Sequence, residues 1–169
     1  EMEFFCKPGT EDQWMDYWKD ARMKWWRKFA RKPDNFRFRA HEPKELAHYA
    51  KACFDIEYLF PWGWDELEGI ASRTDYDLKK HSEFSGKKLE YLDPETQERF
   101  TPYVIEPAAG ATRGVLAYLD DALEEDEIPD AEGVPQKRTV LRLHPQLAPV
   151  KVAVLPLLRK GGLPEKGRE

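Results

Sequence analysis

The sequence has few of the features that mark secreted, membrane-spanning or zinc-binding proteins. Its 169 residues include two cysteines, Cys6 and Cys53, which form no CxxC pair and have no histidine or cysteine at zinc-site spacing. We therefore expect reduced, buried thiols in a cytosolic protein. No apolar run approaches the roughly 20 residues of a membrane span, and no basic segment followed by an apolar one marks a signal peptide. These absences predict a cytoplasmic protein with no membrane partner.

The charge of the chain is moderate and of mixed sign. Lysine and arginine number 27 and aspartate and glutamate 32, for a formal net charge of -5. This balance argues against a DNA-coating surface, so we expect no DNA partner, whereas a local basic strip leaves RNA open. With 41% hydrophobic residues and no internal repeat, the composition is typical of a globular protein with one good core.

Both ends of the chain interrupt a structural pattern. The chain opens without an initiator Met on EMEFFC, which has the pattern of the middle of a strand, and stops in GLPEKGRE shortly after the strand-like VKVAVLPLL. We therefore expect a fragment of a longer protein.

The hydrophobic pattern predicts helices mixed with antiparallel strands. Thr10, followed by acidic residues, is a typical N-cap for a helix over 10–31 with an aromatic face. Further helices are expected over 43–52, 75–84 and 111–123, with strands over 2–5, 35–40, 54–61, 64–73, 138–143 and 150–158 and a hairpin over 91–107. The acidic stretch 124–137, with Pro and Gly, predicts a loop, and a domain boundary is expected near residue 148.

Carboxylates recur within the apolar, strand-like segments. Glu3 lies in MEFF, Glu106 ends the strand before the small-residue turn, and strand alternation predicts that Glu66, Glu68 and Ile70 share one face. Each acid alone is explained by an exposed strand face or a structural ion pair. Together with the arginines at 73 and 113, the group predicts a shared polar pocket, because unpaired carboxylates on apolar strands are costly.

Arg113 follows the turn Ala108, Ala109 and Gly110 and stands at the start of an apolar helix. A guanidinium there adds its charge to the positive end of the helix dipole. The pattern therefore predicts a phosphate-binding position.

Five segments follow one another along the chain: EMEFFCKPGTEDQW, ELAHYAKACFDIEY, FPWGWDELEGIASRTDYDL, PYVIEPAAGATRGVLA and LHPQLAPVKVAVLPL. In this order they resemble the dimeric, class II type of glycyl-tRNA synthetase. The resemblance implies an α+β fold with a class II antiparallel sheet flanked by helices. It also implies ATP-dependent activation of glycine, transfer of glycine to tRNA-Gly, and a homodimer in the full-length enzyme.

The resemblance also assigns roles to residues. PYVIEPAAGATRG, within about 102–123, resembles the third class motif, so Arg113 is expected at the outer phosphates of ATP and Glu66 near ATP and its Mg2+. Glu3 and Glu106 are expected to hold the glycine ammonium, with Arg73 at the glycine carboxylate.

Two positions depart from the family pattern. Ala108 stands where the family has Ser, which removes a hydroxyl from the amino-group site, and Glu1 stands where Gln is usual. The resemblance places the first motif and the second motif, with its arginine for the α-phosphate, upstream of Glu1. We therefore expect residues 1–148 to form part of a catalytic domain and 149–169 the first strand of an α/β anticodon-binding domain. The isolated fragment is expected to be inactive, and a non-catalytic synthetase-like RNA-binding or accessory module remains the alternative.

Other residues have ordinary structural interpretations. His48 is expected to be a packed helix residue rather than a general base, and the tryptophans of residues 14–26 recur at helical intervals typical of a core. The basic residues of the first helix predict a solvated face, and tRNA contact is the weaker interpretation: Arg22, Lys24, Arg27, Lys28, Arg31 and Lys32.

Overall fold

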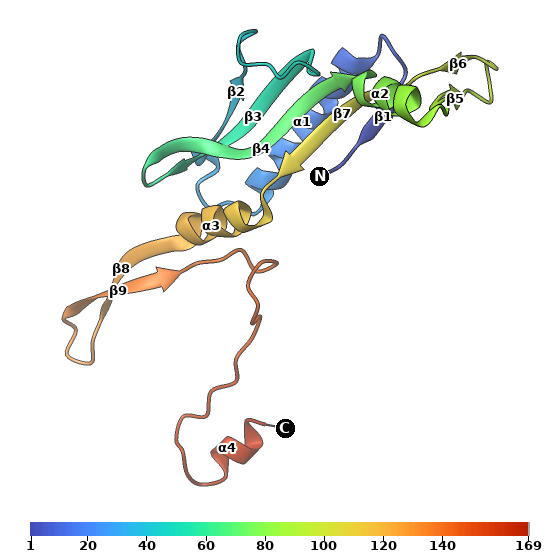
Figure 1. Ribbon diagram of the computed structural model, residues 1–169. Helices are drawn as coiled ribbons and strands as arrows, with labels where there is room; N and C mark the ends of the chain where they lie inside the picture. The colour runs from blue at the N-terminus through green and yellow to red at the C-terminus, as the bar shows by residue number, and fades with distance from the viewer. Residues whose placement is uncertain (169) are drawn as a thin grey trace.

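The computed structural model describes residues 1–168 and shows an α+β protein built on one antiparallel sheet (Figure 1). Five strands form this main sheet in the order β1-β7-β4-β3-β2. Their bounds are β1 (Phe4–Cys6), β2 (Phe36–Ala40), β3 (Ala52–Phe60), β4 (Gly63–Thr74) and β7 (Tyr103–Ala109). Helix α1 (Glu11–Lys28) lies behind the sheet in Figure 1, and the opposite face is open except where α2 (Tyr76–Ser85) lies at one end.

The core lies between α1 and the covered face of the sheet. Met15, Met23 and Trp26 of α1 are buried in one cluster with Ile56 and Ile70 of the sheet. The predicted helix with its aromatic face is confirmed, and Thr10 stands at its N-cap position without a side-chain capping bond. The Thr10 hydroxyl donates instead to the Lys7 carbonyl at 2.7 Å, and no side-chain hydrogen bond caps α1.

Two predictions of local structure are wrong for identifiable reasons. Residues 43–52 form turns rather than a helix, because the Lys51 N–H bonds to the Ser72 carbonyl at 2.8 Å and so continues the sheet. His48 in this segment is exposed, with its Nε2 3.1 Å from the Tyr76 hydroxyl.

The acidic stretch at 124–137 is a hairpin of β8 (Leu123–Pro129) and β9 (Pro135–Leu141). Opposite charges lie across this hairpin, as in the pairing of Asp126 with Arg138, and they stabilise it.

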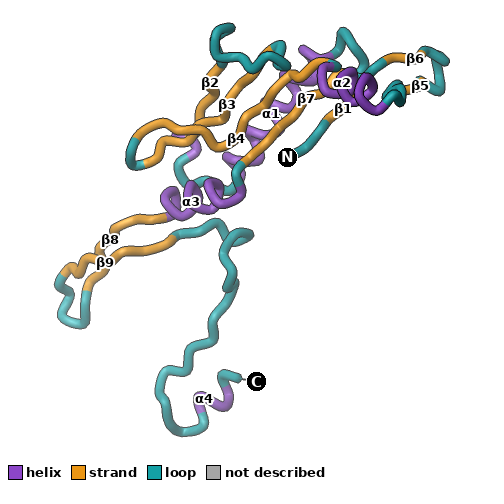
Figure 2. Tube along the Cα trace, viewed as in Figure 1, coloured by secondary structure: helices purple, strands orange, loops and turns teal. Residues whose placement is uncertain are grey.

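The segment expected as one hairpin over 91–107 divides between two sheets. β5 (Tyr91–Leu92) and β6 (Arg99–Phe100) form a small hairpin, whereas β7 joins the main sheet and leads through Gly110 into α3 (Ala111–Ala122). The strand expected at 150–158 is absent from the described part of the chain. No neighbouring strand there offers hydrogen-bonding partners, and the chain runs extended to the short helix α4 (Leu163–Lys166), as the tube in Figure 2 shows.

No helix among residues 1–168 is both long enough and apolar enough to cross a membrane.

Candidate functional site

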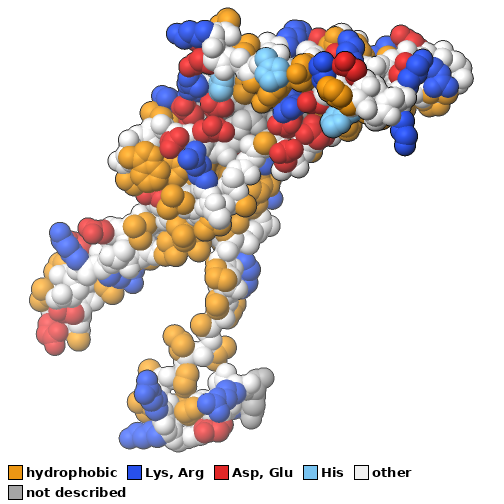
Figure 3. Space-filling view, viewed as in Figure 1, with side chains coloured by type: hydrophobic (Ala, Val, Ile, Leu, Met, Phe, Trp, Pro, Cys, Tyr) orange, Lys and Arg blue, Asp and Glu red, His pale blue; other side chains and the backbone are white. Residues whose placement is uncertain are grey.

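The predicted site residues meet on the open face of the sheet, which Figure 3 views directly. Asp and Glu side chains gather over the strands there, with Lys and Arg among them. Two irregularities in strand pairing decide which side chains reach this face. One lies in β4 at Leu67, and the other lies at Arg73 between β4 and β7.

The irregularity at Leu67 corrects the prediction that Glu66 and Glu68 share a face. Glu66 pairs with Glu57 and Glu68 with the adjacent Ile56, so Leu67 is an extra residue in the ladder. A bulge of this kind shifts the alternation of side chains by one position. Glu66 therefore lies on the open face, whereas Glu68 points into the layer beneath α1 and is 1% exposed.

Glu68 is a structural ion pair rather than a ligand-binding acid. Arg22 of α1 donates from Nε to Glu68 Oε1 at 2.6 Å and from Nη2 to Oε2 at 3.1 Å. The indole N–H of Trp26 donates to the same carboxylate at 2.6 Å. The basic face expected on α1 therefore includes an arginine that fastens the helix to β4. The sequence gives no local signal for this contact, since its partners lie on different elements.

The second irregularity surrounds Arg73. Ser72 pairs with Ile105 and Thr74 with Val104, so Arg73 has no partner in the ladder. Thr74 has a φ of 54°, which is uncommon for a β-branched residue and is typical of strained positions at functional sites. The bulge directs the Arg73 guanidinium across the open face toward β7.

Carboxylates on two elements hold the Arg73 guanidinium. Asp77 of α2 accepts from Nε at 2.7 Å and from Nη2 at 3.2 Å, and Glu106 of β7 lies 2.9 Å from Nη1. Tyr49 lies beneath the guanidinium, with the ring centroid 4.0 Å from Cζ. The hydrogen bonds to Asp77, followed by the charge of Glu106, raise the Arg73 pKa above its already high value. Arg73 is therefore a fixed positive charge.

Three acids converge beside this arginine. Oxygen atoms of Glu1, Glu3 and Glu106 lie within 4.8 Å of one another. Although Glu3 is exposed as a residue, burial of its carboxyl group raises its pKa to about 7, and the hydrogen bond and charge of Glu106 act in the same direction. The raised pKa of Glu3 reflects burial and the neighbouring carboxylate, and a bound cation would offset both effects.

These groups line one cavity of about 380 Å³. Its walls come from β1, β4, α2 and β7, and they include both acids and Arg73. The structure therefore brings three of the predicted glycine-site residues together. Ala108 lies two pairs further along the sheet than Glu106, opposite Gly69, at the floor of the same face.

The predicted nucleotide residues lie at the other end of β7. Arg113 stands in the first turn of α3, and its Nη1 donates to the Glu66 carbonyl at 2.7 Å and lies 3.5 Å from Asp65 Oδ1. Burial, followed by the charge of Asp55, raises the pKa of Glu66, while Arg113 opposes this shift. Arg113 and Glu66 are therefore neighbours at the helix start, as expected for a phosphate position with an adjacent oxygen donor.

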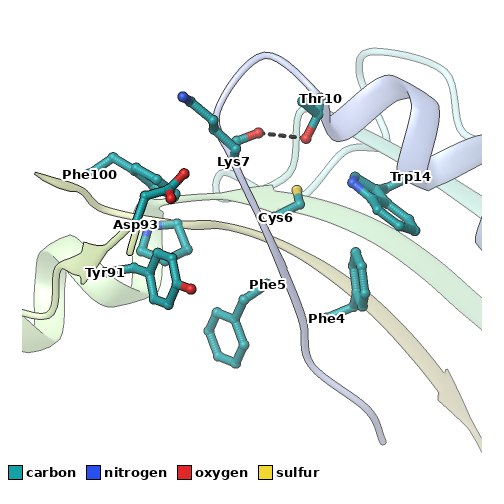
Figure 4. Close-up of a pocket in the computed structure, with 10 residues that line it drawn as sticks. Phe4, Phe5, Cys6, Lys7, Thr10, Trp14, Tyr91, Asp93 and Phe100 are labelled. Carbon is teal, nitrogen blue, oxygen red and sulfur yellow. Dashed lines mark hydrogen bonds between the residues drawn. The ribbon is translucent and has the colours of Figure 1, made fainter. Parts of the chain in front are cut away.

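A larger cavity of about 500 Å³ lies on the other side of β1 and contains none of the predicted site residues (Figure 4). It is lined mostly by apolar side chains. Phe4 packs on Trp14 with ring centroids 4.5 Å apart, and Tyr91 and Phe100 approach from the hairpin β5–β6. The charged open face therefore remains the candidate site.

The fold and this face define an α+β protein in which one side of an antiparallel sheet is packed by helices and the other presents acids and arginines to ligands. No family model matches the chain. Among curated proteins, it is similar to the glycine–tRNA ligase of Streptomyces coelicolor, at 53% identity over 99% of this chain and 37% of that protein. The glycine–tRNA ligase of Geobacillus kaustophilus is 56% identical over 95% of this chain and 34% of its own length. That of Clostridium perfringens is 53% identical over 100% of this chain and 36% of its own length.

The resemblance to glycyl-tRNA synthetases is thereby confirmed over nearly the whole chain. The chain spans about a third of the length of the curated relatives that it matches.

Proposed function

We propose that this chain forms the part of a glycine–tRNA ligase that binds glycine and ATP. The complete enzyme would join glycine to the AMP moiety of ATP, with release of pyrophosphate, and pass the glycyl group to tRNA-Gly. The observation that carries the proposal is the open sheet face, where the Glu3–Glu106 pair, Arg73 and the Arg113 helix start lie on one surface of a chain more than half identical to such ligases. An anticodon-binding domain beginning near residue 149, a homodimer and a cytoplasmic location belong to the same proposal.

The glycine ammonium would lie between Glu3 and Glu106. Two carboxylates attract a single cation, and the ammonium would take the place of the proton that Glu3, with its raised pKa, holds at low pH. A third acid, Glu1, lies within 4.8 Å of both and adds to the negative charge around the ammonium.

Arg73 would hold the glycine carboxylate. A guanidinium has five N–H donors. Contacts to Asp77 and Glu106 occupy three of them, which leaves two for an incoming oxygen. Because Asp77 and Tyr49 fix the plane of the guanidinium, the remaining donors are already oriented.

Arg113 would contact the outer phosphates of ATP, and Glu66 would hold Mg2+. A carboxylate oxygen is a hard donor that suits Mg2+, which when bound neutralises phosphate charge. A glycine carboxylate oxygen then bonds to the α-phosphorus while the bond to the pyrophosphate oxygen breaks. The terminal ribose hydroxyl of tRNA next attacks the glycyl carbonyl, and AMP leaves. Neither step requires a side-chain nucleophile, so the protein acts by orientation and charge.

A chimera tests the proposal in an active context. The 160 matching residues of the Geobacillus kaustophilus ligase are replaced by the corresponding residues of this chain, and glycine-dependent ATP–pyrophosphate exchange and tRNA-Gly charging are measured. We expect both reactions. A folded chimera that binds tRNA but lacks exchange would favour the non-catalytic alternative, for which Ala108 is the supporting observation. The variant Ala108→Ser in the same chimera then shows whether the missing hydroxyl is the cause.

A further inference from the structure

A second group of ligand-type side chains lies on the open face, at the end of β2 and the start of β3. His41 Nε2, Cys53 Sγ and one Asp55 carboxylate oxygen all lie within 4.8 Å of one another. None of the three is among the residues expected to bind glycine or ATP. The sequence spacing does not indicate a zinc site here, because the ligands meet only through strand pairing.

Strand geometry explains why these side chains converge. Cys53 and Asp55 are two residues apart on β3 and therefore project from the same face. The pairing of β2 with β3 continues past Ala40, and the His41 N–H donates to the Cys53 carbonyl at 3.0 Å. This bond places His41 directly across from Cys53. The three ligands therefore stand on a rigid two-strand platform rather than on a mobile loop.

The three side chains are already oriented toward a common point. His41 Nε2 lies 2.7 Å from Asp55 Oδ2. The carboxylate is 7% exposed and the imidazole 21%, and Cys53 is half-buried. Bonds of about 2.0–2.3 Å to a tetrahedral zinc ion place its ligand atoms roughly 3.3–3.7 Å apart, which small side-chain rotations achieve from these positions.

The surroundings favour a cation. A Cβ placed on Gly69 would lie 3.6 Å from Glu66 Oε1 and 3.9 Å from Asp55 Oδ1, so a second carboxylate borders the same part of the open face. Arg39 donates to Asp55 Oδ2 at 3.3 Å and to Glu45 at 2.7 Å, so it orients the carboxylate as outer contacts do in metal sites.

We propose that His41, Cys53 and Asp55 form a binding site for a soft divalent cation of the Zn2+ type. Thiolate, imidazole and carboxylate are a donor set that zinc prefers, and three protein ligands leave a fourth position for water. When the ion binds, the Cys53 thiol proton passes to solvent and a metal–sulfur bond forms, with no change of oxidation state. The site goes beyond the proposed ligase function and does not depend on it.

Absorption with Co2+ tests this site in the 169-residue chain, with Zn2+ as the competing ion. A bound thiolate gives Co2+ an intense near-ultraviolet charge-transfer band, and we expect this band to saturate at about one equivalent and to disappear when Zn2+ is added. The chain offers a matched control because it contains one other thiol, the buried Cys6. We expect Cys53→Ser to abolish the band and Cys6→Ala to retain it.

A second variant guards against a folding defect. His41→Ala changes a partly exposed side chain and should weaken Co2+ binding at least about tenfold while far-ultraviolet circular dichroism stays unchanged. The proposal is overturned if wild-type chain gives no thiolate band, if Cys53→Ser keeps the band, or if folded His41→Ala binds Co2+ as tightly as wild type.

Discussion

The pH dependence of glycine binding gives the sharpest test of the acid pair. The carboxyl group of Glu3, with its pKa raised to about 7 by burial and by Glu106, must lose its proton before the pair can hold an ammonium group. A group with this pKa is about 90% ionised at about pH 8 and about 10% ionised at about pH 6. Glycine keeps its ammonium and carboxylate charges across this range. We therefore expect its affinity to fall about tenfold between these two pH values.

Calorimetric titration of the chimera with glycine measures this effect. Glu3→Gln should weaken glycine at the higher pH and remove most of the pH dependence, because the titrating group is gone. His81 also lines the cavity, and its side chain is an ionisable group other than the acids. His81→Gln is therefore the matched control and should keep the tenfold change. Equal pH dependence in wild type and Glu3→Gln, or its loss in His81→Gln alone, would refute the reasoning.

The same shift has a defined sign for folding. Because the folded-state pKa of Glu3 lies above its ordinary value of 4.5, its contribution to stability is present below that value. The contribution is lost as the pH rises through about 7. Binding of an ammonium group reverses this preference for the protonated carboxyl group, because the positive charge of the ligand stabilises the ionised form of Glu3.

Three further predictions concern single side chains. Arg113→Ala in the chimera should slow pyrophosphate exchange roughly 10²-fold, as expected for a lost transition-state charge contact, and an unchanged rate would remove Arg113 from the site. Glu106→Gln should raise the dissociation constant of glycine by the equivalent of about 1.5–3 kcal/mol and affect ATP far less, whereas equal weakening would indicate a role in folding. Arg22→Ala leaves the buried Glu68 charge with Trp26 alone and should lower the free energy of unfolding by about 3 kcal/mol in urea titrations. Lys24→Ala, which breaks an exposed pair with Asp20, should cost less than about 0.5 kcal/mol, and similar losses in the two variants would contradict the argument.

Periodicity predicted the elements that carry strong patterns. The helix beginning near Thr10, the strands containing Asp55 and Ile70, and the helix after Gly110 are all present. Burial against a neighbouring layer sets the spacing of their hydrophobic residues, and this spacing can be recognised in the sequence alone. Segment 43–52 was misjudged because a single bond from Lys51 to Ser72 outweighs local helix propensity. The β8–β9 hairpin was missed because its acidic strand pairs with basic residues of the next strand, and this complementarity is not visible in the acidic stretch alone.

The candidate site was only partly predictable. The resemblance named Glu3, Arg73, Glu106 and Arg113, and the structure gathers the first three around one cavity. Their roles toward glycine and ATP stay predictions. The raised pKa of Glu3 could not be predicted, since it depends on burial of the carboxyl group and on its closeness to Glu106, which is far away in sequence. The group of His41, Cys53 and Asp55 was not predicted for the same reason, because His41 meets the other two only through strand pairing.

The extra residue at Leu67 separates two tasks that a regular strand would combine. Without this extra residue, Glu66 and Glu68 would project from the same face of the sheet, and any change in the surroundings of that face would affect both carboxylates. With it, a single stretch of backbone carries one carboxylate that holds a helix and another that can meet a ligand. Selection can therefore retune the ligand-facing acid without loosening the helix, and a one-residue deletion here would damage both properties at once.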